Sequence, residues 1–153
     1  MIPPFGRPFA PLPPLLARLH ALLEAHAEET EEGVLIIEQD RRPGAGPAAL
    51  PVVVFVPARP RPEAAAGRAA PELIAEVVLP GAEPREARYA RAGVREYWRV
   101  EPRDAGPPRV VVATEPDGET GRFRIEVAFE GAEPVRSGVL PGLVLRPADL
   151  LEA

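Results

Sequence analysis

The sequence predicts an α/β (α+β) fold: one mixed β-sheet flanked by helices, with a β-hairpin towards the C-terminus. Leucines recur at helical spacing from Pro14 to about Ala27, and a strand, a helix and a second strand follow one another between Pro71 and Val100. The 153 residues suffice for one domain with a single core. We therefore expect a proline-rich arm over residues 1–13 and a single domain over residues 14–153.

The first half of the chain predicts one helix and two strands. The leucines between Pro14 and Ala27 lie on one face of a helix, and polar residues lie on the other. Val34–Ile37 and Val52–Val56 have the composition of strands, and the second is a wholly apolar run typical of a central strand covered on both faces. The proline- and glycine-rich segments Arg42–Ala49 and Pro57–Ala70 are expected to be connecting loops.

The segment Pro71–Val100 is expected to form a crossover between two parallel strands. Leu73–Val78 is an apolar strand interrupted by a glutamate. Glu83–Ala92 has helical composition and is followed by Gly93, a residue that commonly ends helices. Glu96–Val100 then alternates as a second strand, so the two strands are expected to be neighbours in one sheet.

The last third of the chain predicts a hairpin and a short terminal helix. Arg109–Ala113 and Arg122–Phe129 alternate like strands on either side of the turn residues Asp117 and Gly118. Val139–Leu145 is expected to be extended, and Arg146–Glu152 to form a helical turn that begins at a proline.

Two carboxylates in the central segment are candidates for a functional site. Glu72 and Glu76 lie on one face of the predicted strand, but their Cα atoms are ~13 Å apart, too far to hold one metal ion together. Glu76 has mostly apolar neighbours, and a carboxylate in such a place needs a metal ion or a cationic side chain. Two interpretations stay open: Glu76 binds a divalent metal, or it forms an ion pair with Arg85 or Arg88.

Composition excludes several classes of protein and site. There is no cysteine and there are two histidines, so a metal would be held by oxygen ligands. No run of apolar residues reaches the length of a membrane span, and the N-terminus does not resemble a signal peptide, so we expect a cytoplasmic protein without a membrane segment. The net charge of -5 argues against broad electrostatic attraction to DNA, although a local arginine surface remains compatible with it.

Three stretches of the chain resemble a known family. PELIAEV, YARAGVREYWRVEP and VLPGLVLRPADLLEA are similar in wording and spacing to the restriction endonuclease family called Uma-two, within the PD-(D/E)xK nuclease superfamily. Its members typically show PDLVVEV, a lysine four residues before a tyrosine, and a GV-EYW-VDP block. The resemblance is closest over Pro71–Pro102. It implies a restriction-endonuclease-like fold and Mg²⁺-dependent hydrolysis of DNA.

The resemblance also implies site residues. Glu76 matches the metal-binding glutamate of the family, and Glu72 replaces the aspartate of PDLVVEV and is a further candidate ligand. Arg85 stands where the family has its lysine, four residues before Tyr89. Arginine keeps its charge and can stabilise a phosphorane, but it cannot accept a proton as a lysine of lowered pKa can.

The chain departs from the family pattern at two further places. The family carries an aspartate at the start of the preceding strand, and here Val52 occupies that place, in PVVVFV. An aliphatic side chain cannot bind a hard cation. The ELIDGE-like hairpin that opens the family pattern is missing. A second oxygen ligand would have to come from a neighbouring strand, where Glu38 and Asp40 are the candidates.

Two functions follow from the sequence. The first is a catalytically degenerate relative, without a cofactor, that acts as a dimeric binding or scaffold module. The alternative is a Mg²⁺-dependent DNA endonuclease with Glu76 as ligand and Arg85 as charge stabiliser. For the dimer, we expect the proline-rich arm, with Phe5 and Phe9, to reach across to a second copy of the chain.

Overall fold

The computed structural model describes residues 14–38, 51–59, 71–81 and 83–151. The order of elements predicted from the sequence is confirmed: helix, three strands, helix, strand and hairpin. The elements are α1 (Pro14–Thr30), β1 (Gly33–Glu38), β2 (Val52–Pro57), β3 (Leu73–Val77), α3 (Glu86–Ala92), β4 (Glu96–Glu101), β5 (Arg109–Asp117), β6 (Arg122–Phe129) and the 3₁₀ helix η1 (Pro147–Leu151).

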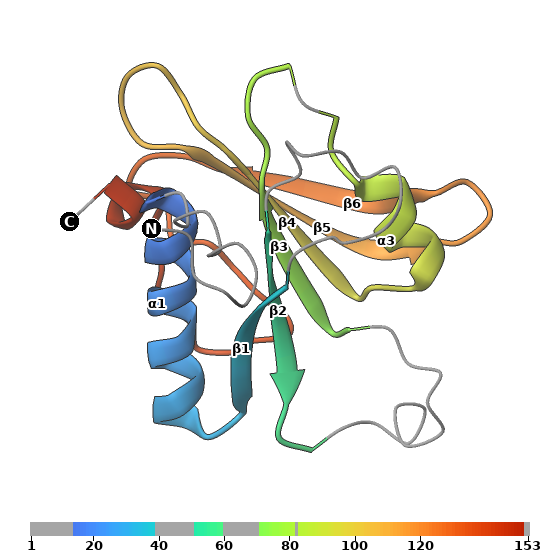
Figure 1. Cartoon of the computed structure of the whole chain (residues 1–153), viewed down its shortest axis with the longest axis horizontal. Helices are drawn as coiled ribbons and strands as arrows, with labels where there is room; N and C mark the ends of the chain where they lie inside the picture. Colours follow the sequence, from blue (N-terminus) through green and yellow to red (C-terminus); the bar gives the residue numbers. More distant parts are fainter. Residues whose placement is uncertain (1–13, 39–50, 60–70, 82, 152–153) are drawn as a thin grey trace, which may run out of the picture.

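The six strands form one mixed sheet in the order β1-β2-β3-β4-β5-β6. β3 and β4 run parallel and are joined through α3, as the crossover prediction requires, and every other neighbouring pair is antiparallel. α1 and η1 lie together on one side of the sheet, and α3 lies near the far end of the β5–β6 hairpin (Figure 1). The fold is therefore α+β, consistent with a restriction-endonuclease-like architecture.

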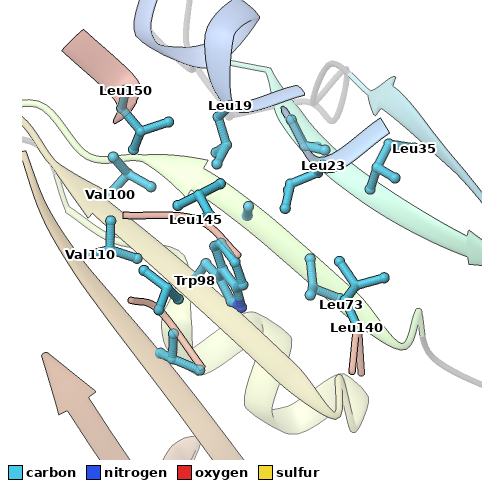
Figure 2. Close-up of a cluster of buried hydrophobic side chains, with 14 of the residues drawn as sticks. Leu19, Leu23, Leu35, Leu73, Trp98, Val100, Val110, Leu140, Leu145 and Leu150 are labelled. Atoms are coloured by element: carbon cyan, nitrogen blue, oxygen red, sulfur yellow. The ribbon is translucent and has the colours of Figure 1, made fainter. Parts of the chain in front are cut away.

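The larger core lies between α1 and the sheet. Leu16, Leu19 and Leu23 form the buried stripe of α1, because residues three and four apart share one face of a helix. Figure 2 shows Trp98 of β4 among leucines that come from separate parts of the chain. The C-terminal segment completes this core with Leu140, Leu145 and Leu150.

A smaller core lies under α3, on the opposite face of the sheet. Tyr97 of β4 packs between Tyr89 of α3 and Phe123 of β6, with ring centroids 5.5 and 5.7 Å away. Side chains alternate between the faces of a strand, so Tyr97 belongs to this core while Trp98 belongs to the larger one. The buried members of the smaller core are Val52, Val54, Ile74, Tyr89, Ala90, Val94, Tyr97, Ala113 and Phe123.

Several boundaries differ from the sequence predictions, and β5, for example, continues to Asp117 instead of Ala113. Three differences have a structural reason. α3 begins at Glu86 instead of Glu83, because the backbone N–H of Arg85 donates to a side-chain oxygen of Glu76 at 3.2 Å and holds the preceding residues against the sheet. α1 continues to Thr30, whose hydroxyl donates to the carbonyl of His26 at 2.9 Å.

The third difference is the segment 139–145, which forms no strand in the described structure. Its backbone turns at residues 138–142 and its leucines enter the larger core instead of pairing with the sheet. The predicted loop Arg42–Ala49 and most of Pro57–Ala70 lie outside the described residues. None of the described helices is long and apolar enough to span a membrane.

Candidate functional site

Four residues form a row across the sheet on the face that α3 covers. Glu38 pairs with Val52, Val52 with Glu76, and Glu76 with Arg99 in the registers of four successive strands. Residues directly opposite each other in a sheet share a face, so the four side chains emerge side by side. With strands ~4.8 Å apart, the Cα atoms of Glu38 and Glu76 are ~10 Å apart, and Val52 lies between them.

The carboxylate of Glu76 is buried and accepts three hydrogen bonds. Glu76 is 3% exposed. Arg85 Nε donates to Oε1 at 3.2 Å, and the Arg85 backbone N–H donates to Oε2 at 3.2 Å. The hydroxyl of Tyr97 donates to Oε2 at 2.5 Å. Of the two interpretations of Glu76, the ion pair with Arg85 is thus present in the structure.

Tyr97 supplies a neutral donor to this carboxylate. Burial raises the pKa of the Tyr97 hydroxyl above its ordinary value, and the negative charge of Glu76 raises it further. The hydroxyl therefore keeps its proton throughout the physiological range and always donates to Glu76. Tyr89 is in contact with the Tyr97 ring and continues the packing towards α3.

Arg99, the register partner of Glu76, directs its guanidinium group to three other carboxylates. Its Nε lies 3.2 Å from Glu101, and Nη1 lies 3.5 Å from Glu126 and 3.8 Å from Glu86. Burial lowers the pKa of Arg99, but the charges of Glu101 and Glu126 outweigh it and the pKa is raised. The pKa of Glu86 is also raised, first by burial and then by a hydrogen bond and charge repulsion from Glu126.

Glu72 and Glu38 lie apart from Glu76. Glu72 precedes β3 and pairs with Arg95 at 3.4 Å. Arg88 lies over the ring of Tyr89, 5.8 Å from its centroid. Glu38 is exposed at the end of β1, and Asp40 lies outside the described residues. In the ranges that the structure describes, no three carboxylate or histidine side chains are grouped so as to hold a metal ion.

The oxygen ligands available around Glu76 fit Mg²⁺ poorly. The ion prefers several oxygen ligands in octahedral geometry and is usually held by one or two carboxylates. Here the oxygens of Glu76 already accept bonds from Arg85 and Tyr97, and the neighbouring position is Val52. A cation at this point would also lie beside the positive charge of Arg85.

Tyr97 was not among the site residues that the sequence predicted. A usable signal was present: the alternation of Glu96–Val100 placed Tyr97 and Arg99 on one face, and a parallel neighbour brings that face beside Glu76. The hydroxyl then has the buried carboxylate within reach.

A second buried carboxylate lies on the opposite face of β4. Glu96 is 1% exposed and accepts hydrogen bonds from Trp98 Nε1 at 2.8 Å, the Ser137 hydroxyl at 2.5 Å and the Gly138 backbone N–H at 2.9 Å. No sequence pattern pointed to it, because two of its three donors come from a segment 41 and 42 residues away. Glu96 fastens the C-terminal segment to the sheet.

The family model described as "Putative restriction endonuclease", Uma2, matches residues 14–148. The chain belongs to the Uma2 family. The resemblance inferred from the central motifs is thereby confirmed, and in this chain the Uma2 match extends from α1 to the start of η1. No curated protein matches the chain. Membership of this family makes the chain a nuclease-like protein. The row formed by Glu38, Val52, Glu76 and Arg99 lies inside the matched region.

Proposed function

We propose that this Uma2 protein is catalytically degenerate and acts in the cytoplasm as a dimeric binding or scaffold module. One observation carries the proposal. The carboxylate of Glu76, which matches the family's glutamate, already accepts hydrogen bonds from Arg85 and Tyr97, and Val52 lies opposite it where a second carboxylate is needed. The protein itself fills the place of a metal ion.

Charge explains why Mg²⁺ would not displace this arrangement. A metal ion would have to break the Glu76–Arg85 ion pair in a buried place, and it would leave the guanidinium group close to a second cation. Glu76 alone offers one negative charge, which does not offset the free energy that the ion loses when part of its hydration shell is removed. Without a held metal, no water is activated for in-line attack on a phosphodiester.

The alternative function is a Mg²⁺-dependent DNA endonuclease of the PD-(D/E)xK type. One observation favours it: Glu38 lies in the same row as Glu76, on the same face of the sheet, and supplies a second carboxylate nearby. The Cα atoms of Glu38 and Glu76 are ~10 Å apart and Val52 lies between them, so the two carboxylates cannot easily bind the same ion. The net charge of -5 gives no support for broad attraction to DNA.

Plasmid cleavage decides between the two functions. We expect no hydrolysis above background by the purified protein in Mg²⁺ or Mn²⁺, because neither ion finds a second carboxylate beside Glu76. Wild type and Glu76→Ala are assayed side by side in each metal. Cleavage by the wild type that disappears in Glu76→Ala would refute degeneracy and direct the search for a second ligand to Glu38, Asp40 and Glu72.

A further inference from the structure

The described sheet has two edge strands, β1 and β6. An edge strand leaves backbone N–H and C=O groups free to pair with another chain. β1 is six residues long and packs against α1. β6 is eight residues long, and its contact with a helix is with the short α3. β6 is therefore the longer of the two edges.

β6 also carries exposed apolar side chains. Ile125 and Val127 are 44% and 46% exposed. Strand alternation places both on the face opposite Glu126, which points towards Arg99. Val127 lines an open groove of about 900 Å³ together with Val112, Phe129 and charged residues that include Glu133 and Arg136. Half-exposed aliphatic residues beside such a groove are typical of a contact surface.

On its other face, β6 borders a cluster of carboxylates. Glu86, Glu101 and Glu126 surround Arg99, and Arg109 Nε lies 3.7 Å from Glu101. Three carboxylates thus lie close to one another and to the guanidinium groups of Arg99 and Arg109. Burial raises the pKa of Glu86, and Glu126 raises it further.

Another cation of β6, Arg124, has an ion-pair partner outside that cluster. The side chain of Arg124 is 69% exposed, and its Nη2 lies 3.9 Å from a carboxylate oxygen of Asp117. An ion pair this open contributes little to stability. Arg124 can therefore change partner at small cost.

We propose that a second copy of this chain docks on β6, with the two β6 strands antiparallel about a twofold axis at Ile125. This inference rests on the dimeric part of the proposed function and names its surface. In this arrangement Ile125 faces Ile125 of the second copy, and Arg124 of each copy faces Glu126 of the other. Each copy then supplies a cation to the carboxylate cluster of its partner.

The charges on β6 select this register. Moving the axis by one residue places Arg124 opposite Arg124 or Glu126 opposite Glu126, and like charges directly opposite destabilise a strand pair. Paired strands add backbone hydrogen bonds along the edge of each sheet.

Charge substitutions in the full-length chain test the proposal. Sedimentation velocity gives the dimer dissociation constant at protein concentrations up to on the order of 100 µM, a range that includes small, weak interfaces. We expect Arg124→Glu and Glu126→Arg, each alone, to raise that constant ~tenfold or more, because each places like charges opposite each other. Arg122→Glu is the matched control: residue 122 faces Ala128 in this register, and dimerisation should not change.

Mixing the two variants gives a sharper outcome. Arg124→Glu presents two acidic side chains and Glu126→Arg two basic ones, so an equimolar mixture should form a heterodimer while each variant alone stays largely monomeric. Circular dichroism checks that each variant is folded. If Glu126→Arg does not fold, Ile125→Asp replaces it as the second single variant. Ile125→Asp places the carboxylates of the two copies opposite each other at the twofold axis and should also weaken the dimer.

The possible results separate the claims. A wild type that stays monomeric would refute both this inference and the dimeric part of the proposed function. A wild-type dimer that Arg124→Glu and Ile125→Asp leave unchanged would refute the β6 interface alone. Variants that are each monomeric and also fail to associate when mixed would refute the register at Ile125.

Discussion

At the scale of single residues, the Glu76–Arg85 pair determines what the site can do. The Glu76 carboxylate is buried, and Arg85 is its cationic partner. We expect Glu76→Ala to lower the free energy of unfolding by ~1–4 kcal/mol, since it leaves Arg85 without its acceptor. Arg85→Ala should cost ~3–5 kcal/mol, because it leaves a charge buried.

Urea unfolding of both single variants and the double variant measures the coupling. The double variant should cost less than the two single costs together, by ~1–3 kcal/mol, because the residues contact each other. Arg95→Ala is the matched control: it breaks the half-exposed pair with Glu72 and should cost less than ~1 kcal/mol. Additive effects of Glu76→Ala and Arg85→Ala would contradict a direct ion pair.

Restoring the missing carboxylate should restore metal binding. In Val52→Asp combined with Arg85→Ala, a new carboxylate faces Glu76 from the adjacent strand and the competing cation is gone. We expect calorimetry to detect Mn²⁺ binding to this double variant and none to the wild type. Val54→Asp with Arg85→Ala is the control, since residue 54 shares the face but pairs with Ile74. Equal binding in both double variants would argue against this metal position.

At the scale of elements, the contact between α3 and the sheet contains an unfavourable charge. The pKa of Glu86 is raised above the ordinary 4.5 by burial and by Glu126, so the folded state holds the Glu86 proton more tightly than the unfolded state. Stability is therefore lost as the pH rises from 4.5 through the raised pKa.

Glu86→Gln removes this loss. We expect the variant to be more stable than the wild type at pH 7 and nearly equal to it below pH 4.5, as measured by thermal unfolding across the pH range. Asp117 should have the opposite dependence: backbone N–H groups of Glu119 and Thr120 lower its pKa, so the stability it contributes is lost in acid. A Glu86→Gln variant that is less stable than the wild type at pH 7 would contradict a raised pKa.

The sequence predicted the elements well where local pattern determines them. The leucine stripe of α1 and the alternation of β3, β4 and β6 depend on neighbouring residues, and all were recognised. The start of α3 was wrong, because it depends on a hydrogen bond from Arg85 to a residue nine positions earlier. The same limit explains why the Tyr97 hydroxyl and the donors from Ser137 and Gly138 were missed: they meet their carboxylates only after the sheet has formed.

At the scale of the whole molecule, we propose that the proline-rich arm and the β6 edge contribute separately to a dimer. The arm lies outside the described residues, and we proposed from its sequence that it reaches across to a second copy. We expect deletion of residues 1–11 to weaken the dimer and leave β6 pairing intact, since the deletion does not touch β6. Light scattering with and without the arm measures this. An unchanged dissociation constant would exclude the arm from the interface.

The fastening of the C-terminal segment has a consequence for the order in which the larger core folds. Leu140, Leu145 and Leu150 share this core with the leucine stripe of α1, and Arg18 donates to the carbonyl of Asp149, 131 residues further along the chain, at 3.2 Å. A contact between such distant residues forms only after a long loop has closed, and contacts of this kind slow folding. We therefore expect the C-terminal segment to join the larger core after the local elements have formed.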